Sequence, residues 1–335
     1  MQLFDVLIVG GGPAGSSCAR TLGAAGLKAA VIDAREFPRD KPCAGWITPR
    51  VLELLELTPD EYGRHGRVIQ PITAFRTGLA GTPLVETRYG RVVSYGIRRL
   101  EFDDFLLRRS GAGLVLGERV ERVWRDGERW VVNERFAAPM LVGAGGHFCP
   151  VARVLSKHTF RHETAVLAQE IELPANQAGI RQRHAADLFF CPELNGYGWV
   201  FPKGDYLNVG FGSIGHSTFH ARLDAFRAVV RRHPELRPLA NAKWHGHAYL
   251  LSGLSSREII GDGALLVGDA AGLANPLSGE GILPAVESGL MAAETILGAE
   301  GVYERARLEN YRRRIRRRYG VGWRSAAGGS RAVCC

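Results

Sequence analysis

The sequence predicts an α/β protein with a large domain built on a parallel sheet and a second, smaller domain. Two glycine-rich segments support this prediction: DVLIVGGGPAGSS at residues 5–17 and LLVGDAAGLANPLSGEGI at 265–282. Each joins a short apolar run, typical of a buried strand, to a turn and a helix. Between them, segments of alternating aromatic residues predict further strands, because side chains alternate between the two faces of a sheet.

The composition is that of an ordinary globular protein. The chain has 335 residues, of which 46% are hydrophobic and 23% are charged, enough for two domains. The formal net charge is +9, and much of the excess lies in YRRRIRRRYG at residues 311–320. This basic segment is interpreted as a solvated helix face or as a contact with an anionic membrane surface. No DNA-binding signature occurs, so nucleic acid is not a predicted partner.

The cysteines and histidines indicate neither disulfides nor a metal site. The six cysteines are scattered without a CxxC pair, and His245-x-His247 is interpreted as one face of a structural strand. Residues 1–10 suit a strand rather than a signal peptide, and no apolar run is long enough to span a bilayer. We therefore expect a cytoplasmic protein, with membrane association left open by the basic segment. The sequence does not indicate an oligomeric state.

The first glycine-rich segment has the spacing of a dinucleotide-binding turn. The apolar run 6–9 suits a central parallel strand, and GxGxxG follows at 10–15. These glycines allow a tight turn, a close approach to a diphosphate and close helix packing, while the helix N-terminus stabilises negative charge. A second strand over 28–33 would end at Asp33, where a ribose-binding acid is expected. The predicted cofactor contacts of this region are Gly10, Gly12, Pro13, Ala14, Gly15, Asp33, Ala34 and Arg35.

The second glycine-rich segment predicts a strand and turn over 265–272 and a helix rich in small residues that opens near 282. It resembles the GD motif of the FAD-dependent oxidoreductases of the p-hydroxybenzoate hydroxylase fold. By that resemblance, Asp269 holds the ribityl chain of FAD and Pro276 lines the flavin plane. A helix N-terminus would face the pyrimidine edge, where a reduced flavin carries negative charge. The resemblance adds as cofactor contacts Gly268, Asp269, Pro276, Gly279, Gly281 and Ile282.

Two further segments match this family. IRRLEFD at 97–103 resembles its R-x-x-F-D segment, which places Arg99 at the cofactor. LVGAGG at 141–146 stands where the family usually reads G-A-D-G, so Gly145 replaces an aspartate at a cofactor-contact position. Because of this departure, the resemblance does not imply that the protein uses NADPH in the same way as its relatives. The implied fold is an FAD-binding Rossmann-like domain of the glutathione reductase/p-hydroxybenzoate hydroxylase type with an inserted antiparallel β-sheet substrate domain.

The resemblance also predicts the domain boundaries. The FAD-binding domain is expected to be discontinuous, over 1–67, 97–160 and 256–335, and the substrate-binding domain to come from 68–96 and 161–255. The expected strands of the insertions lie at 72–75, 91–95, 165–171, 198–201 and 207–211, with a helix over 222–233. Relatives continue well beyond the second cofactor helix, which implies a more open substrate pocket here or one completed by another subunit.

Two segments narrow the family to the geranylgeranyl reductases. FPRDKPCAGW at 37–46 resembles their F-P-R-x-K-x-C-G-G segment, with Ala44 in place of a glycine, and GYGWVFP at 196–202 resembles their Y-x-W-x-F-P motif. The resemblance implies that Tyr197, Trp199 and Phe201 line an isoprenoid-binding cavity; the alternative is a plain strand with a buried aromatic face. Cys43 and Ala44 would lie at the flavin. Cys43 would protonate a substrate carbon or modulate the flavin, or else be a buried filler.

The resulting hypothesis is an FAD-dependent reductase that saturates carbon–carbon double bonds of an isoprenoid or similar hydrophobic substrate. Its predicted catalytic residues are Cys43, Tyr197 and Trp199. The reductant would be NAD(P)H or a small electron carrier, since no separate nicotinamide-binding domain is evident. The alternatives are an aromatic or polyketide hydroxylase or related dehydrogenase, a flavin-dependent halogenase, which the lack of lysines between 41 and 157 disfavours, and an FAD-binding protein with little turnover.

Overall fold

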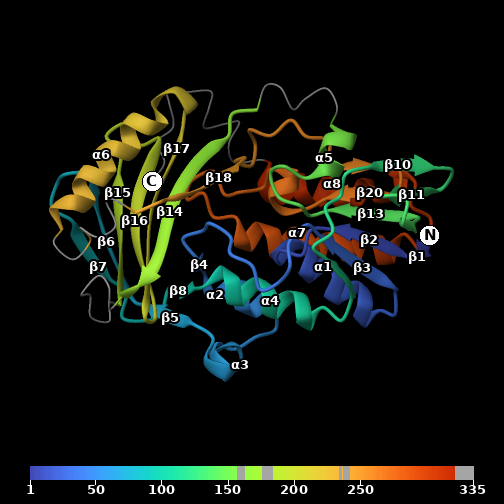
Figure 1. Cartoon of the computed structure of the whole chain (residues 1–335), viewed down its shortest axis with the longest axis horizontal. Helices are drawn as coiled ribbons and strands as arrows, with labels where there is room; N and C mark the ends of the chain where they lie inside the picture. Colours follow the sequence, from blue (N-terminus) through green and yellow to red (C-terminus); the bar gives the residue numbers. More distant parts are fainter. Residues whose placement is uncertain (157–162, 176–183, 234–235, 237–241, 321–335) are drawn as a thin grey trace. The chain divides into compact units, whose positions relative to one another are not determined.

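The computed structural model describes residues 1–156, 163–175, 184–233, 236 and 242–320 (Figure 1). The two C-terminal cysteines and the rest of the segment after the basic helix therefore lie outside the described residues. In the described part of the chain, no helix is long and apolar enough to cross a membrane.

The chain divides into two compact units, each assembled from segments that are distant in the sequence. Unit 1 comprises the described residues of 1–39, 103–163 and 249–320, and unit 2 those of 40–102 and 164–248. The assignment of cofactor binding and substrate binding to separate domains, with the boundaries given above, stays a prediction.

A six-stranded sheet forms the centre of unit 1. Its strand order is β19-β20-β13-β2-β3-β9, and all neighbours are parallel except the antiparallel pair of β19 and β20. The central strands are apolar along their whole length because both faces of the sheet are covered. The strands are β2 (Val6–Val9), β3 (Ala29–Asp33), β9 (Gly113–Leu116), β13 (Met140–Gly143), β19 (Ile260–Gly261) and β20 (Ala264–Leu266).

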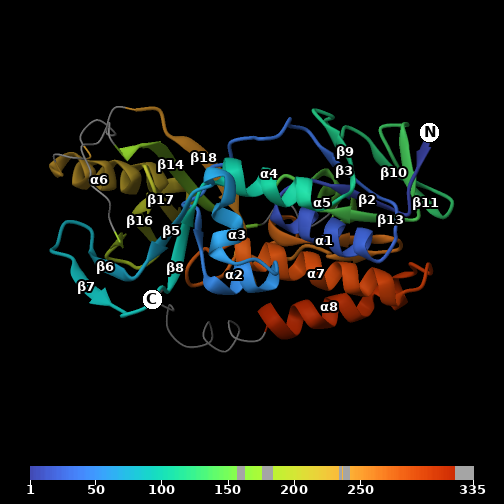
Figure 2. The same ribbon diagram turned by 90° about the horizontal axis from the view of Figure 1, so that it is seen from below.

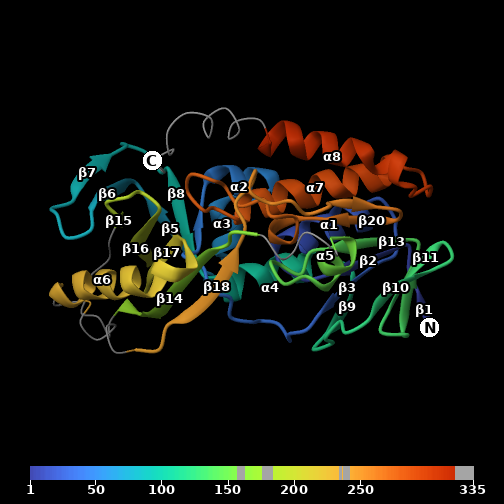
Figure 3. The ribbon, with the colours of Figure 1, turned by 90° about the horizontal axis from the view of Figure 1, so that it is seen from above.

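A smaller sheet of unit 1 has the order β1-β12-β11-β10, with β1 parallel to β12 and the other pairs antiparallel. Figure 3 shows β10 and β11 beside the strands of the six-stranded sheet. The bounds are β1 (Gln2–Leu3), β10 (Val123–Asp126), β11 (Arg129–Val132) and β12 (Phe136–Ala138).

The helices of unit 1 pack closely because small residues lie where they touch. Figure 2 shows α7 alongside α1, with α8 on the other side of α7. A Cβ atom at Gly289 would lie only 2.3 Å from the carbonyl oxygen of Ala14, so this approach of α1 and α7 requires glycine. The Tyr311 hydroxyl donates to the Leu266 carbonyl at 2.6 Å and anchors α8. The helices are α1 (Pro13–Ala24), α5 (Pro150–Leu155), α7 (Ile282–Gly298) and α8 (Arg305–Tyr319); α4 (Arg99–Arg109) runs across the boundary of the two units.

A seven-stranded sheet forms unit 2, in the order β18-β14-β17-β16-β15-β6-β7. The neighbours β14–β17, β17–β16, β16–β15 and β6–β7 are antiparallel, and β15–β6 is parallel. The bounds are β6 (Ala74–Leu79), β7 (Val85–Arg88), β14 (Val166–Pro174), β15 (Ala185–Phe190), β16 (Gly196–Lys203), β17 (Tyr206–Ile214) and β18 (His245–Tyr249).

Helix α6 (Phe219–Arg232) lies against one face of this sheet (Figure 1). Phe219 and Phe226 of the helix form a buried cluster with Val200 and Phe211 of the strands. A second sheet of unit 2 has the order β4-β8-β5 and is antiparallel throughout. Its strands and the remaining helices are β4 (Trp46–Ile47), β5 (Ile69–Ile72), β8 (Ser94–Ile97), α2 (Pro49–Leu54) and α3 (Pro59–Gly63).

Most predicted elements are present, and two have the wrong bounds. The expected strand over 72–75 is in fact a junction, because β5 ends at Ile72 and β6 begins at Ala74 in a different sheet. Both flanking side chains are buried, so apolarity does not mark the break at Thr73. The strand expected over 91–95 instead begins at Ser94.

Candidate active site

The first glycine-rich turn of unit 1 leaves the N-terminus of α1 open to an anion. Gly10 has φ of +112°, and a Cβ there would lie 2.4 Å from the carbonyl oxygen of Ala144, so only glycine fits. Gly12 precedes α1, and among the described residues no side chain caps the helix. The first-turn amides and the helix dipole therefore remain available to a diphosphate. The Gly145 amide nitrogen lies beside Gly10, at 2.7 Å from that same Cβ position.

Asp33 is fixed at the carboxyl end of β3. Its Oδ2 accepts the Gly11 N–H at 2.8 Å and its Oδ1 accepts the Arg35 N–H at 2.9 Å. Both bonds come from backbone, so the carboxylate keeps its orientation and still has lone pairs for a hydroxyl group. This is the geometry expected of a ribose-binding acid.

Arg39 is a residue that the sequence reasoning missed. Its Nη2 pairs with Asp103 at 3.0 Å and lies 3.6 Å from the position of a Cβ on Gly12. Its Nη1 is buried and has no hydrogen-bond partner among the described residues. A buried guanidinium nitrogen without an acceptor, next to the first turn, fits a bound diphosphate. The signal was present in the F-P-R segment, which was used only to identify the family.

The second turn of unit 1 meets the first through small residues. Gly268 N–H donates to Ser288 Oγ at 2.9 Å, which ties the turn Gly268–Ala271 to α7. Asp269 Oδ1 lies 3.3 Å from the position of a Cβ on Gly281, so the carboxylate lies at the start of α7. No side chain of the described chain caps α7 either. Both helix N-termini and Asp269 thus belong to one cradle within unit 1.

Asn275 closes the loop that precedes α7. Its Oδ1 accepts the N–H groups of Leu277 and Ser278 at 2.8 and 3.2 Å, and its carbonyl accepts the Gly279 N–H at 2.9 Å. Pro276 therefore lies in a turn that the hydrogen bonds of Asn275 fix. Asn275 was not among the predicted residues, although an Asn-Pro pair before glycines is a turn signal.

Glu280 lies between the two glycines of this loop. Burial raises the pKa of its carboxyl to about 7, the neighbouring Glu287 carboxylate adds to the increase, and Arg318 opposes it. Within the described residues, Glu280 Oε1 has no hydrogen-bond partner. This carboxyl group is therefore poised to change its charge near neutral pH.

Arg257 holds the second turn from behind. Its guanidinium donates to the carbonyl of Ala270 at 3.0 Å and forms an ion pair with Glu163 at 2.9 Å. Its Nη2 also lies 3.3 Å from His147 Nδ1. The side chains of Arg257 and Glu163 are 0% and 4% exposed, so the pair is fully removed from water. Arg257 was not predicted, since a single arginine outside a motif carries no sequence signal.

In unit 2, the predicted substrate residues share one face of the large sheet. Tyr197, Trp199, Phe201 and Lys203 alternate along β16 and therefore point to the same side, while Val200 points to α6. Trp199 and Phe201 are buried and Tyr197 is half-buried. The strand thus alternates as predicted, and its aromatic side chains form a buried cluster opposite the helix, with Tyr197 at the edge of that cluster.

The loop that carries Cys43 lies on this aromatic face. Trp46 stacks on Phe201, with ring centroids 5.2 Å apart, and also contacts Phe75 at 5.3 Å. Trp46 Nε1–H donates to Ser94 Oγ at 2.7 Å, which fixes the indole. Ala44 packs against the same cluster. Segments that are far apart in the sequence therefore bring Cys43 and the Y-x-W-x-F motif together within unit 2.

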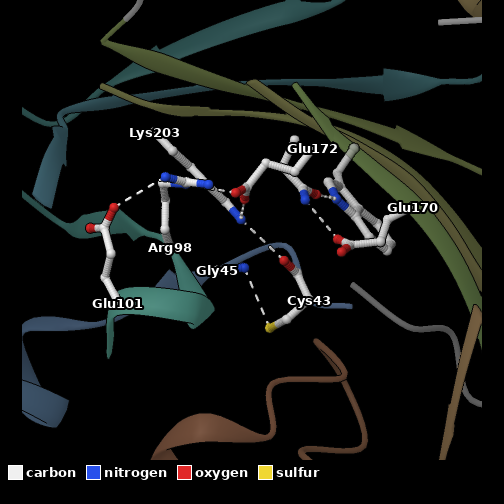
Figure 4. Close-up of polar contacts among 9 residues, drawn as sticks. Cys43, Gly45, Arg98, Glu101, Glu170, Glu172 and Lys203 are labelled. Atoms are coloured by element: carbon white, nitrogen blue, oxygen red, sulfur yellow. Dashed lines mark hydrogen bonds and ion pairs between the residues drawn. The ribbon is translucent and has the colours of Figure 1, made fainter. Parts of the chain in front are cut away.

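Polar groups surround the Cys43 backbone (Figure 4). Lys203 Nζ donates to the Cys43 carbonyl at 3.1 Å and to Glu172 Oε2 at 2.6 Å, and the Gly45 N–H lies 3.4 Å from Cys43 Sγ. Arg98 binds Glu172 Oε1 at 2.8 Å. Burial acts to raise the pKa of Glu172, but the two cations outweigh it and hold that pKa below its usual value. Burial raises the pKa of Glu170 despite the nearby Lys203.

The predicted site residues fall into two groups. The structure brings together in unit 1 Gly10, Gly12, Pro13, Ala14, Gly15, Asp33, Ala34, Arg35, Gly145, Gly268, Asp269, Pro276, Gly279, Gly281 and Ile282. Unit 2 contains Cys43, Ala44, Arg99, Tyr197, Trp199 and Phe201, of which Arg99 is buried at the start of α4. Their roles stay predictions.

Comparison with known proteins assigns the chain to a class. A model of the FAD binding domain family matches residues 4–101. Among solved structures, a geranylgeranyl bacteriochlorophyll reductase-like protein from Thermoplasma acidophilum superposes with a TM-score of 0.80 over 96% of this chain and 85% of that chain, at 24% identity. A halogenase, PltM, solved with FAD superposes with a TM-score of 0.71 over 93% of this chain and 73% of that chain, at 18% identity. The predicted fold class is confirmed: the chain matches an FAD binding domain and has the p-hydroxybenzoate hydroxylase type of fold.

Curated relatives define the family more closely. The menaquinone reductase of Mycobacterium tuberculosis is 32% identical over 314 residues, covering 87% of this chain and 76% of the relative. The digeranylgeranylglycerophospholipid reductase of Methanothrix thermoacetophila is 31% identical over 320 residues, covering 88% and 78%. The chain belongs to the geranylgeranyl reductase family of FAD-dependent reductases, which confirms the predicted family.

Proposed function

We propose that this protein reduces carbon–carbon double bonds of an isoprenoid chain. The observation that carries the proposal is the aromatic face of unit 2, on which the Cys43 loop is held by the stacking of Trp46 on Phe201. The relatives that share most of this chain are named as reductases of menaquinone and of digeranylgeranylglycerophospholipid. Both names denote molecules with long prenyl chains, which an apolar aromatic surface suits.

The cradle of unit 1 fits FAD. Among the described residues, nothing caps the N-terminus of α1 or pairs with Arg39 Nη1, and both features suit the diphosphate of FAD. The doubly anchored Asp33 suits a ribose. The start of α7 suits the electron-rich edge of the flavin. When bound and reduced, FAD supplies a hydride to one carbon of the double bond.

The side chains of unit 2 do the rest of the chemistry. The apolar faces of Tyr197, Trp199 and Phe201 bind the prenyl chain and exclude water. The thiol of Cys43 donates a proton to the carbon that does not receive the hydride, and the resulting thiolate regains a proton from solvent. Hydride and proton together saturate one double bond. The Trp199 indole is fixed for its role, because its Nε1–H donates to Asn208 Oδ1 at 2.7 Å.

The proposal also includes a class of reductant and a contact with the membrane surface. NAD(P)H or a small electron carrier would reduce the flavin transiently. The exposed arginines of α8, such as Arg313, Arg316 and Arg317, would attract the anionic surface of the bilayer that contains the lipid substrate. The two curated relatives described above are named as reductases, and the likeness to the halogenase is one of fold.

An anaerobic turnover assay tests the proposal. Holoenzyme is incubated with dithionite and either geranylgeranyl diphosphate or a geranylgeranylated phospholipid, and the products are weighed by mass spectrometry. We expect products heavier by two hydrogen atoms per reduced bond, and we expect Cys43→Ala to slow their formation by about tenfold or more. If the prenyl chains stay unchanged while oxygen and an aromatic substrate give a hydroxylated product, the hydroxylase interpretation replaces this one.

A further inference from the structure

The backbone of Cys43 is held by an ionisable side chain of the large sheet of unit 2. Lys203 Nζ donates to the Cys43 carbonyl at 3.1 Å (Figure 4). The Cys43 backbone also lies close to the carboxyl of Glu170 and acts to lower its pKa. Lys203 comes from β16 and Glu170 from β14, so one strand holds the loop residue and a second strand brings a carboxyl close to it.

Lys203 is an unusual residue to find at this depth. Its side chain is 1% exposed, and burying an ammonium group is costly unless it is paired and hydrogen-bonded. Glu172 supplies the countercharge at 2.6 Å, and Arg98 shares that carboxylate from the other side at 2.8 Å. The ion pair with Glu172 explains how the buried charge of Lys203 is tolerated. The other hydrogen bond of the ammonium group goes to the Cys43 carbonyl and indicates that Lys203 holds the Cys43 backbone in place.

The loop is shaped to receive the ammonium group. Gly45 has φ of +64°, which favours glycine. A Cβ at Gly45 would lie 2.0 Å from the Ile97 carbonyl oxygen and 2.6 Å from Lys203 Nζ. The absence of a side chain at Gly45 thus lets Lys203 reach the Cys43 carbonyl, while the Gly45 N–H points to the thiol sulfur at 3.4 Å.

Glu170 connects the same loop to the substrate face. Asn208 Nδ2–H donates to Glu170 Oε2 at 2.7 Å, and Trp199 Nε1–H donates to Asn208 Oδ1 at 2.7 Å. A chain of hydrogen bonds therefore runs from the Trp199 indole through Asn208 to the Glu170 carboxyl, which lies close to the Cys43 backbone. All members of this chain are buried or half-buried, where such bonds are least disturbed by water.

We propose that Lys203 is a positioning residue that fixes the Cys43 thiol relative to the Trp199 ring, and that the Glu170 carboxyl supports the same loop. Holding the C=O of Cys43 restricts the backbone rotation that sets the direction of its Cα–Cβ bond. The inference rests on the proposed function, in which Cys43 delivers a proton to a substrate carbon. We call the contact of Lys203 with the Cys43 carbonyl, together with the Glu170 carboxyl, the Cys43 clamp. Proton delivery is sensitive to small displacements of the donor, so loosening the clamp should slow this step.

A double-mutant cycle tests the role of Lys203. Lys203→Met keeps the length of the side chain, and Glu172 keeps Arg98 as a partner. In anaerobic stopped-flow experiments, we expect Lys203→Met to slow flavin reoxidation by geranylgeranyl diphosphate by about tenfold when Cys43 is present and by less than about twofold in a Cys43→Ala background. Flavin reduction by dithionite should be unchanged. An equal loss in both backgrounds would mean that Lys203 is merely structural.

Arg98→Met is the matched control for this cycle. It removes the other cation of Glu172 but no bond to Cys43. We expect a smaller rate loss than for Lys203→Met, and the same loss with or without Cys43. If the Arg98 variant depends on Cys43 as strongly as the Lys203 variant does, the ion-pair network as a whole is responsible and the specific clamp is wrong.

Glu170 is tested by comparing two substitutions. Glu170→Gln keeps an oxygen acceptor close to the Cys43 backbone, whereas Glu170→Leu removes it. We expect the glutamine variant to retain most of the reoxidation rate and the leucine variant to lose about tenfold, again only when Cys43 is present. Equal rates for the two variants would overturn the role of Glu170.

A chemical probe separates failure of the clamp from failure of the proposed function. If reduced wild-type enzyme transfers no hydride to the prenyl substrate, the proposed function is wrong. The clamp is then tested by the rate at which iodoacetamide alkylates Cys43, measured on the Cys43 peptide by mass spectrometry. We expect Lys203→Met to accelerate alkylation severalfold and Arg98→Met to leave it unchanged. An unchanged rate in the Lys203 variant would overturn the inference.

Discussion

The guanidinium group of Arg257 donates to the backbone carbonyl of Ala270 at 3.0 Å, and so ties a buried charge to the second glycine-rich turn. Its partner Glu163 is equally buried. Removing one member of such a pair leaves the other charge uncompensated.

We therefore predict that Arg257→Met lowers the free energy of unfolding by about 3–5 kcal/mol. Because the turn carries Asp269, the variant should also retain less FAD after gel filtration. Urea denaturation and the flavin absorbance measure the two effects. Arg257→Met combined with Glu163→Gln should recover part of the stability, and a double variant as unstable as the single one would contradict the uncompensated-charge explanation.

Arg39 should contribute directly to FAD affinity. Its buried Nη1 lacks a partner among the described residues and lies near the first turn, so we predict that Arg39→Met weakens FAD binding by about tenfold to a hundredfold. Titration of the apoprotein with FAD, followed by flavin fluorescence, measures this change. Arg108→Met is the control, because Arg108 donates to the Phe37 carbonyl nearby but is half exposed. Equal affinities of the two variants would exclude a diphosphate contact by Arg39.

Glu280 predicts a pH dependence of stability. Its carboxyl has a folded-state pKa of about 7 against 4.5 in the unfolded chain. The unfolded state therefore releases its proton first, and the free energy of unfolding falls as the pH rises from 4.5 to 7. Glu280→Gln removes this contribution. After allowance for partial exposure, we expect the variant to be about 1–3 kcal/mol more stable than the wild type above pH 7, with no difference below pH 4.5.

Urea denaturation across that pH range, at a fixed excess of FAD, checks this prediction. The change should be confined to the interval between the two pKa values. A constant difference between Glu280→Gln and wild type at every pH would show that folding does not shift the pKa of this carboxyl group.

The exposed arginines of α8 predict salt-sensitive membrane binding. Replacing Arg313, Arg316 and Arg317 by glutamate should abolish co-sedimentation with vesicles that contain anionic lipid. The wild-type protein should lose binding as salt increases, and should not bind neutral vesicles. Charge reversal of Arg119, Arg122 and Arg129 in unit 1 is the matched control, since it changes the net charge equally. If both triple variants lose binding alike, net charge and not α8 determines it.

The sequence predicts the residues of the glycine-rich turns better than the rest of the candidate site, because the conformation of each turn depends on residues close together in the sequence. The turn at Gly10 and the acid at Asp33 are fixed by short spacings along one strand-turn-helix unit. In contrast, the bonds of Lys203, Glu170 and Arg257 join segments that only the folded chain brings together.

Apolar patterns have a similar limit in the fold. The alternation in β16 gives the face of Tyr197 and Trp199 correctly, because one strand continues through the motif. The buried segment around Thr73 instead contains the point at which the chain passes from one sheet to another. Backbone hydrogen bonds determine that point, and the hydrophobic pattern does not show it.

We expect a prenyl double bond to oxidise the reduced flavin of this protein. A single turnover tests this expectation: photoreduced holoenzyme is mixed anaerobically with geranylgeranyl diphosphate while the visible absorbance of oxidised flavin is followed. We predict recovery of the oxidised spectrum with one saturated bond per flavin. A flavin that stays reduced with every prenyl substrate, yet is reoxidised by oxygen, would contradict it.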